Sequence, residues 1–223
     1  MWETAKFAGI DPLEIIDYVH PEDTPLRRLF LKHSEQVRDK ALAILRNSRL
    51  DLDVQLVVSG AMLHDIGIVN CHAPKILCLG PEPYIAHGVI GGALLREFGR
   101  QNGIDLEIHA RICERHTGSG ITATEVRAQG LPIPERDYLP ETPEEKLVCL
   151  ADKFFSKSGD MQEKSLDRIR RSMEKFGEDS LARFDELCDY FEIEQSRRHF
   201  DRSQNDQTAG EEENLIQDKD TYR

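Results

Sequence analysis

The sequence has no long hydrophobic run and few cysteines. No apolar stretch approaches the ~20 residues that a membrane-spanning helix needs, and the first residues, MWETAKFAGIDPLE, have no signal-peptide pattern. The cysteines, at positions 71, 78, 113, 149 and 188, are scattered and form no CxxC pair. This pattern argues against both a disulfide framework and a zinc ribbon. We therefore expect a cytoplasmic protein with reduced thiols and no membrane partner.

Basic residues are also few. The chain has 29 Lys and Arg against 41 Asp and Glu, which gives a formal net charge of -12. Non-specific binding to nucleic acid depends on neutralising phosphates with Lys and Arg, so we expect no nucleic-acid partner. An acidic chain is better suited to collecting cations. Residues 201–223 are polar and acidic, and we expect this tail to be disordered.

Period-two alternation of β-branched residues is almost absent, whereas helical periodicity is widespread. Two capping boxes, Thr122 with Glu125 and Thr142 with Glu145, mark helix starts. Three glycines at 88, 91 and 92 weaken one expected helix, and close approach of another helix or a ligand would explain them. The sequence therefore predicts an all-α, single-domain helical bundle. The expected helices cover about 25–47, 53–64, 84–98, 105–116, 142–155, 162–176 and 180–195.

Several ionisable side chains fall where the hydrophobic pattern predicts the interior. His33 lies on the apolar stripe of the first of these helices, and the pair His64-Asp65 ends the second. Asp152 lies within the apolar run LVCLADKFF. Burying such groups is costly unless a partner compensates them. Imidazole and carboxylate ligands without thiolates suit Zn, Mn, Fe, Ni or Co better than Ca.

Two further histidines stand at sites that suggest a ligand role. His87 lies among the glycines of YIAHGVIGG, and His116 lies where a helix gives way to the turn of ERHTGSG. Each also has a simpler explanation. His87 could be a polar residue in a glycine-lined helix crossing, and His116 could be a helix C-terminal histidine placed favourably against the helix dipole.

The ordered set of His33, His64-Asp65 and Asp152 within LADK resembles the HD superfamily of metal-dependent phosphohydrolases. HDIG at 64–67 is the form that names one large branch of it. The resemblance covers roughly residues 25–160 and implies that these four residues bind one metal ion. It divides the chain into an N-terminal segment (1–24), an HD domain (25–160), C-terminal helices packing on it (161–200) and the acidic tail.

A second layer is similar to binuclear members of the superfamily, in which the aspartate of the HD pair bridges two metals and two further histidines hold the second. This resemblance implies that role for Asp65, His87 and His116. The segment HTG…PETPEEKLVCLADK is also similar to small HD proteins that split dinucleoside tetraphosphates. The chain departs from the cyclic-dinucleotide branch in two ways. That branch has a lysine where this chain has Ile68, and its signature is longer than the RHTGSGIT found here, so the resemblance does not extend to a cyclic-di-GMP role. The chain most resembles stand-alone HDIG proteins of bacteria and archaea.

These features predict a phosphohydrolase that uses a metal-activated water on a nucleotide or another small phosphoester. One or two divalent ions (Mn, Fe, Ni, Co or Zn, with Mg also open) are implied. Asp65 and Lys153 are the candidate catalytic residues. The alternatives are a binuclear dinucleoside-polyphosphate or cyclic-nucleotide phosphodiesterase, a non-catalytic metal- or nucleotide-sensing module, and an oxygenase. Lys75 and Arg115 are further candidates for holding phosphate, whereas His20, His72, His109 and His199 are expected to be ordinary core or surface residues.

Overall fold

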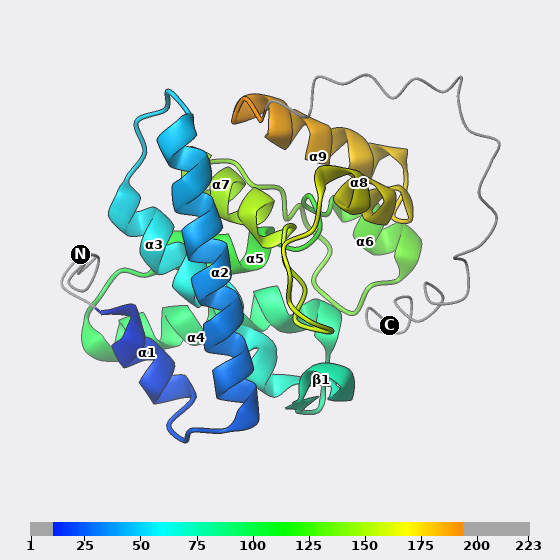
Figure 1. The fold of residues 1–223 in the computed structure, drawn as a ribbon. Helices are drawn as coiled ribbons and strands as arrows, with labels where there is room; N and C mark the ends of the chain where they lie inside the picture. Colours follow the sequence, from blue (N-terminus) through cyan, green and yellow to red (C-terminus); the bar gives the residue numbers. More distant parts are fainter. Residues whose placement is uncertain (1–10, 194–223) are drawn as a thin grey trace, which may run out of the picture.

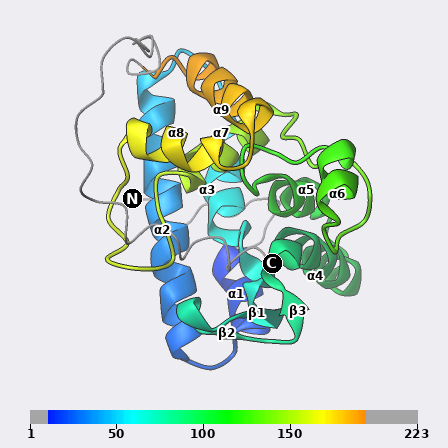
Figure 2. The same ribbon diagram turned by 90° about the vertical axis from the view of Figure 1, so that its right-hand side faces the viewer.

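The computed structural model describes residues 11–193, and helices make up most of them. A long helix, α2, runs along one side of the molecule, and α3 and α7 pack against it (Figures 1 and 2). The helices are α1 (Pro12–Val19), α2 (Pro25–Asn47), α3 (Val54–Leu63), α4 (His87–Asn102), α5 (Glu107–Arg115), α6 (Ala123–Gln129), α7 (Pro143–Asp152), α8 (Leu166–Glu174) and α9 (Glu178–Tyr190). None of the helices in this part of the chain is both long and apolar enough to cross a membrane.

Helix starts follow the local sequence signals. Both predicted capping boxes are present: Thr122 and Thr142 each accept a hydrogen bond from the backbone of a glutamate three residues on, and that glutamate caps the threonine backbone in return. Thr24 caps α2, with Pro25 at its first position, and Asp53 caps α3. These caps satisfy backbone N–H groups that a helix cannot satisfy itself.

The prediction of a strictly all-α fold is wrong in one place. The loop between α3 and α4 contains a small sheet of order β2-β1-β3, in which β1 is antiparallel to β2 and parallel to β3. The strands are Cys71–Ala73, Cys78–Leu79 and Glu82–Pro83. Strands of two or three residues are too short to show alternation, so periodicity could not reveal them. Short 3-10 helices complete the loop: η1 (Ile66–Asn70), η2 (Pro74–Ile76) and η3 (Tyr84–Ala86).

Other boundaries shift modestly from the expected ones. The first turn of the helix expected at 84 is the 3-10 helix η3, and α4 itself begins at His87. Helices α8 and α9 are shorter than the expected 162–176 and 180–195. Helix α1 lies in the N-terminal segment, for which no helix was expected. The acidic tail lies outside the described residues.

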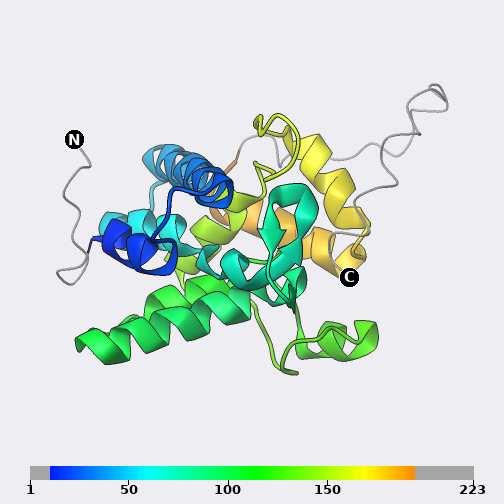
Figure 3. The same cartoon turned by 90° about the horizontal axis from the view of Figure 1, so that it is seen from below.

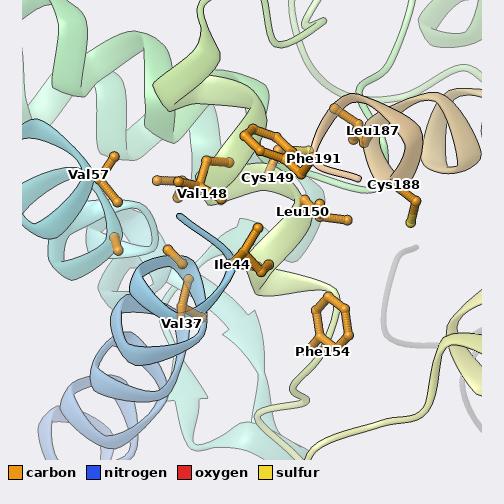
Figure 4. Close-up of a cluster of buried hydrophobic side chains, with 14 of the residues drawn as sticks. Val37, Ile44, Val57, Val148, Cys149, Leu150, Phe154, Leu187, Cys188 and Phe191 are labelled. Atoms are coloured by element: carbon orange, nitrogen blue, oxygen red, sulfur yellow. The ribbon is translucent and has the colours of Figure 1, made fainter. Parts of the chain in front are cut away.

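Two hydrophobic clusters form the core. The first joins the C-terminal half of α2 to α3, α7, α8 and α9, and Figure 4 shows Val37, Val57, Leu150 and Leu187 among the side chains of this cluster. The second joins α1 and the N-terminal half of α2 to α4, α5 and the small sheet. Each large side chain buried in this way stabilises the fold by about 1.5–3 kcal/mol. All five cysteines are free and buried in these clusters, as expected for reduced thiols.

The second cluster is built on a close pair of helices. Helices α4 and α5 lie side by side, as Figure 2 shows, and α4 also packs against η1. Seen from below, α4 extends across one side of the molecule beside the segment that contains β1 (Figure 3). Since α2 contributes to both clusters, the middle of this helix lies at their junction. The ionisable residues singled out in the sequence meet there.

Candidate metal centre

Six predicted ligands come together at this junction from five different helices. His33 lies in the middle of α2, between Phe30 and Val37 of the two clusters. The other five stand at helix ends. His64 follows α3 and Asp65 precedes η1, His87 begins α4, His116 follows α5, and Asp152 ends α7. All six are buried, with at most 9% of the residue exposed.

The first group consists of His33, His64, Asp65 and Asp152. His33 Nε2 lies 2.9 Å from Asp152 Oδ1 and 3.3 Å from Asp65 Oδ2. His64 Nε2 lies 3.1 Å from the same Asp65 oxygen and 3.5 Å from Asp152 Oδ1. Atoms bound ~2.0–2.2 Å from one transition-metal ion would themselves lie roughly 2.8–3.6 Å apart. The group therefore has the dimensions of a single coordination shell.

The second group consists of Asp65, His87 and His116. The two imidazole Nε2 atoms are 3.0 Å apart, and they lie 3.5 and 3.4 Å from Asp65 Oδ1. Asp65 thus turns Oδ2 toward the first group and Oδ1 toward the second. A carboxylate that divides its oxygens in this way can bridge two ions.

The hydrogen bonds of three histidines fix which nitrogen faces the centre. Nδ1 of His64, His87 and His116 lies 2.7, 2.6 and 2.7 Å from the carbonyl oxygens of Ala61, Tyr84 and Cys113, respectively. A carbonyl only accepts, so each Nδ1 carries the proton. In the neutral ring Nε2 then carries the lone pair. The Nε2 lone pairs of the three histidines face the carboxylate of Asp65. Such an arrangement of acceptors facing acceptors is that of metal-ligating histidines.

Buried atoms without well-aligned partners support the same conclusion. His64 Nε2 and both oxygens of Asp65 accept no well-aligned hydrogen bond and are shielded from solvent, although Asp65 Oδ2 also lies 2.5 Å from Lys157 Nζ. Native structures rarely leave such groups unsatisfied. A divalent cation in each group would satisfy all three atoms, so the residues present fit a metal site.

Without a metal, the centre distributes its charge unevenly. Burial lowers the pKa of His64, but the carboxylates of Asp65 and Asp152 outweigh this effect and raise the pKa to about 9. Burial, aided by neighbouring His116, lowers the pKa of His87 to about 3. Burial would raise the pKa of Asp65, yet Lys157 above all, followed by His64, holds it well below its usual range. The carboxylates are therefore ionised and ready to bind a cation.

Glycines let the helices carrying these residues approach closely. A Cβ atom on Gly67, within HDIG, would lie 2.1 Å from the carbonyl oxygen of His87. A Cβ on Gly88 would lie 2.4 Å from the carbonyl oxygen of Cys113 in α5. Both neighbours are backbone atoms that cannot swing aside. The close approach expected from the glycines of α4 is thus confirmed, against both η1 and α5.

Two lysines contact the carboxylates of the centre, and the contact of Lys157 with Asp65 was not predicted. Lys153 Nζ lies 2.7 Å from Asp152 Oδ2 and donates to the carbonyl oxygen of His116 at 3.1 Å. These are the contacts of a residue that positions ligands, and its predicted catalytic role stays a prediction. Lys157 Nζ lies 2.5 Å from Asp65 Oδ2. Lys157 lies in the segment after α7, where helical periodicity does not predict the direction of a side chain. The remaining sequence signal for a place near the site is its position five residues after Asp152.

The other candidates lie apart from the two groups. Arg115 donates to the carbonyl of Leu139 at 3.0 Å and pairs with Glu141 at 2.8 Å, so it holds the segment before α7 rather than a ligand. Lys75 is exposed on η2. Among the four histidines expected to be ordinary, His20 is buried and stacks on Phe30, His72 is exposed, His109 is bonded to Ser59 Oγ at 2.8 Å, and His199 lies outside the described residues.

Relatives of the chain were found among curated proteins. Over 122 residues it is 42% identical to an uncharacterised protein of Methanocaldococcus jannaschii, covering 55% of this chain and 61% of the relative. It is 34% identical to proteins of Picrophilus torridus and Thermoplasma volcanium, each named tRNA (cytidine(56)-2'-O)-methyltransferase. Those two matches cover 64% and 70% of this chain but 38% and 40% of the relatives. The chain thus spans about three fifths of the first relative and two fifths of the others.

No solved structure matches the chain at a comparable level of significance. The model of the HD domain family matches residues 30–156, more than half of the chain. This range contains the six residues of the two groups. The chain therefore belongs to the HD domain family.

Proposed function

We propose that this protein is a metal-dependent phosphohydrolase acting on a nucleotide or another small phosphoester. One observation carries the proposal: Asp65 directs one oxygen to His33 and His64 and the other to His87 and His116. This arrangement favours two ions over one. Two-metal sites of this kind hold their ions ~3.5–4 Å apart, a spacing that serves in-line displacement at phosphorus.

The reaction consumes one water. A bond forms between the water oxygen and phosphorus, the bond from phosphorus to the ester oxygen breaks, and the leaving oxygen takes up a proton. Divalent ions would supply a lowered pKa for the attacking water and charge to balance the phosphoryl oxygens. In this chain His33, His64 and Asp152 would hold one ion and His87 and His116 the other, with Asp65 shared.

The surrounding residues keep these ligands in place. The carbonyls of Ala61, Tyr84 and Cys113 hold three imidazoles in the Nε2-ligating tautomer. Lys153 holds Asp152 from its outer side. We propose residues 25–160 as the catalytic domain and 161–200 as a C-terminal segment; in its described part, up to residue 193, α8 and α9 complete the first hydrophobic cluster.

Two relatives are named as tRNA methyltransferases, and this raises methyl transfer to RNA as a second candidate. About three fifths of each of these relatives lies outside the match, so their named activity does not have to reside in the shared part. The histidine–carboxylate groups suit metal chemistry rather than methyl transfer. The acidic charge of this chain also disfavours RNA as a partner. We therefore propose a small-molecule substrate.

The test is a metal and substrate screen on the purified protein. Bound metal is quantified, and phosphate release is followed across mononucleotides, cyclic nucleotides and dinucleoside polyphosphates with Mn, Co, Ni, Fe or Mg added. We expect two equivalents of metal per chain and metal-dependent turnover of at least one phosphoester. Tight metal binding with no turnover on any substrate would favour the sensing module instead. Oxygen consumption by the iron-loaded protein would favour the oxygenase, and methylation of tRNA would favour the methyltransferase.

A further inference from the structure

Lys157 places a positive charge against an oxygen that would bind the first metal ion. Its Nζ lies 2.5 Å from Asp65 Oδ2, the oxygen that His33 Nε2 and His64 Nε2 also approach at 3.3 and 3.1 Å. The lysine side chain is 10% exposed, so the ammonium is shielded from water. Asp65 is the carboxylate that compensates it. Within residues 11–193 no other carboxylate lies at ion-pair distance from this Nζ.

An ion in the first group would compete with Lys157 for Asp65 Oδ2. The ion would bind Asp65 Oδ2, and a dication and an ammonium sharing one buried oxygen repel each other strongly because the surroundings screen them weakly. We therefore expect Nζ to move away from Asp65 when the ion binds. Its flexible four-carbon stem allows such a movement without displacing the backbone.

The segment that carries Lys157 is held at several points, so the displaced ammonium stays near the centre. Gln36 of α2 donates to the carbonyl oxygen of Met161 at 2.8 Å, and Lys40 pairs with Glu163 at 2.5 Å. The backbone N–H of Lys164 donates to the carbonyl of Phe154 at 2.8 Å. The first two contacts tie the segment 154–164 to α2, and the third joins its two ends. A lysine released here has lost its counter-ion but not its place beside the ligands.

Nearby lysines increase the need for an incoming anion. Lys164 is half-buried, and burial together with Lys153 and Lys157 outweighs the attraction of Asp152 and lowers its pKa to about 8. Lys153 remains tied to Asp152. Once Asp65 is occupied by metal, Lys157 has no carboxylate of the described residues at ion-pair distance. An oxygen of a phosphoryl group drawn to the same metal would be the partner it needs.

We propose that Lys157 is a phosphoryl-binding residue that exchanges Asp65 for the substrate when metal binds. This inference rests on the proposed phosphohydrolase function. It makes two measurable claims with opposite signs. Lys157 competes with metal for Asp65 and so weakens metal binding, but it strengthens the binding of a phosphoryl group to the metal-loaded protein.

The experiment compares Lys157→Met with the parent protein and with Lys146→Met. Lys146 is a half-buried lysine of α7 whose Nζ lies over the ring of Tyr190, so Lys146→Met controls for the loss of one positive charge away from Asp65. Manganese affinity is measured by competition with a chelating dye. Binding of inorganic phosphate to the manganese-loaded protein is measured by titration calorimetry. Lys157→Arg keeps the charge, and it serves as the second variant if the methionine variant does not fold.

For Lys157→Met we expect manganese to bind about tenfold more tightly and phosphate at least about tenfold more weakly, with Lys146→Met like the parent on both counts. Lys157→Arg should retain phosphate binding. Phosphate binding unchanged in Lys157→Met would overturn the proposal, as would a parent protein that binds no phosphate when loaded. Weaker binding of both metal and phosphate would show a merely structural role and also overturn it. Weaker phosphate binding without a gain in metal affinity would rule out the exchange.

These readouts separate the two proposals. The binding measurements use manganese and inorganic phosphate and require no turnover. If the parent protein hydrolyses no phosphoester, yet Lys157→Met binds manganese more tightly and phosphate more weakly than the parent, the proposed function fails and Lys157 keeps its role as an anion-binding residue. If the parent is active and Lys157→Met binds phosphate normally, the phosphohydrolase stands and the assignment of Lys157 falls.

Discussion

Replacing Gly67 by alanine should remove the second metal ion and spare the first. The added Cβ would lie 2.1 Å from the carbonyl oxygen of His87 and 2.4 Å from the backbone nitrogen of Gly91. Real Cβ atoms essentially never approach within 3.0 Å, so α4 must move away by about 0.9 Å at its first turn. Metal–ligand distances tolerate only about ±0.2 Å. A shift of this size therefore takes His87 out of coordinating range.

The expected cost has a structural and a catalytic part. Forcing extra volume into a packed site typically costs about 1–3 kcal/mol of stability. Misplacing a reacting group by about 1 Å can reduce turnover roughly 100-fold. We therefore expect bound metal to fall from two equivalents toward one, with the first group of His33, His64, Asp65 and Asp152 intact.

The assay is metal analysis of Gly67→Ala beside Gly60→Ala, with thermal unfolding of both. The Cβ at position 60 would meet the Cδ1 atom of Ile112 at 2.6 Å, the flexible end of a side chain that can adjust. Gly60→Ala should keep two equivalents of metal. A Gly67→Ala protein that retains both ions and the parent's turnover would refute the close-approach argument.

Three further predictions concern the ligands themselves. Asp65→Asn should keep the helical fold by circular dichroism but lose both ions and reduce turnover at least about 1,000-fold, because the metals supply several kcal/mol to the reaction; near-parent activity would contradict a bridging Asp65. His87→Ala or His116→Ala should each cut bound metal from two equivalents toward one and lower turnover by orders of magnitude, whereas a mononuclear site would show one equivalent throughout. Metal affinity of the metal-free protein should rise roughly tenfold per pH unit up to about pH 9 and level off above it, because protonated His64 must release one proton to bind; affinity that does not change between pH 6 and 9 would mean that His64 binds no metal.

The sequence predicted which residues gather at the junction, because each of them lies within a helix or at the end of one. His33 falls on the apolar stripe of α2, and helical spacing alone places it inside. The glycines of α4 also carried a readable signal, since each costs stability that a close contact can explain. The order of His33, His64-Asp65 and Asp152 along the chain resembles the HD superfamily, and this resemblance indicated that residues of separate helices share one site. Periodicity could not have shown that these helices meet.

The failures have a common physical cause. Arg115 lies next to His116, but adjacent helical residues point in different directions, and its guanidinium turns toward Glu141. Lys157 lies in an irregular segment, where no period fixes the direction of a side chain. The small sheet consists of strands of two and three residues. In each case the outcome depends on tertiary contacts rather than on local pattern.

Three candidate ligands are each oriented by a hydrogen bond within one helical turn. Each of His64, His87 and His116 bonds to a carbonyl three residues earlier in the chain. Every amino acid has that carbonyl, so the side chains at 61, 84 and 113 can change without loss of the orienting bond. An inserted or deleted residue within the turn would instead rotate the imidazole by about 100°. For these ligands, evolution is free to vary the neighbouring residue types and is constrained in the spacing.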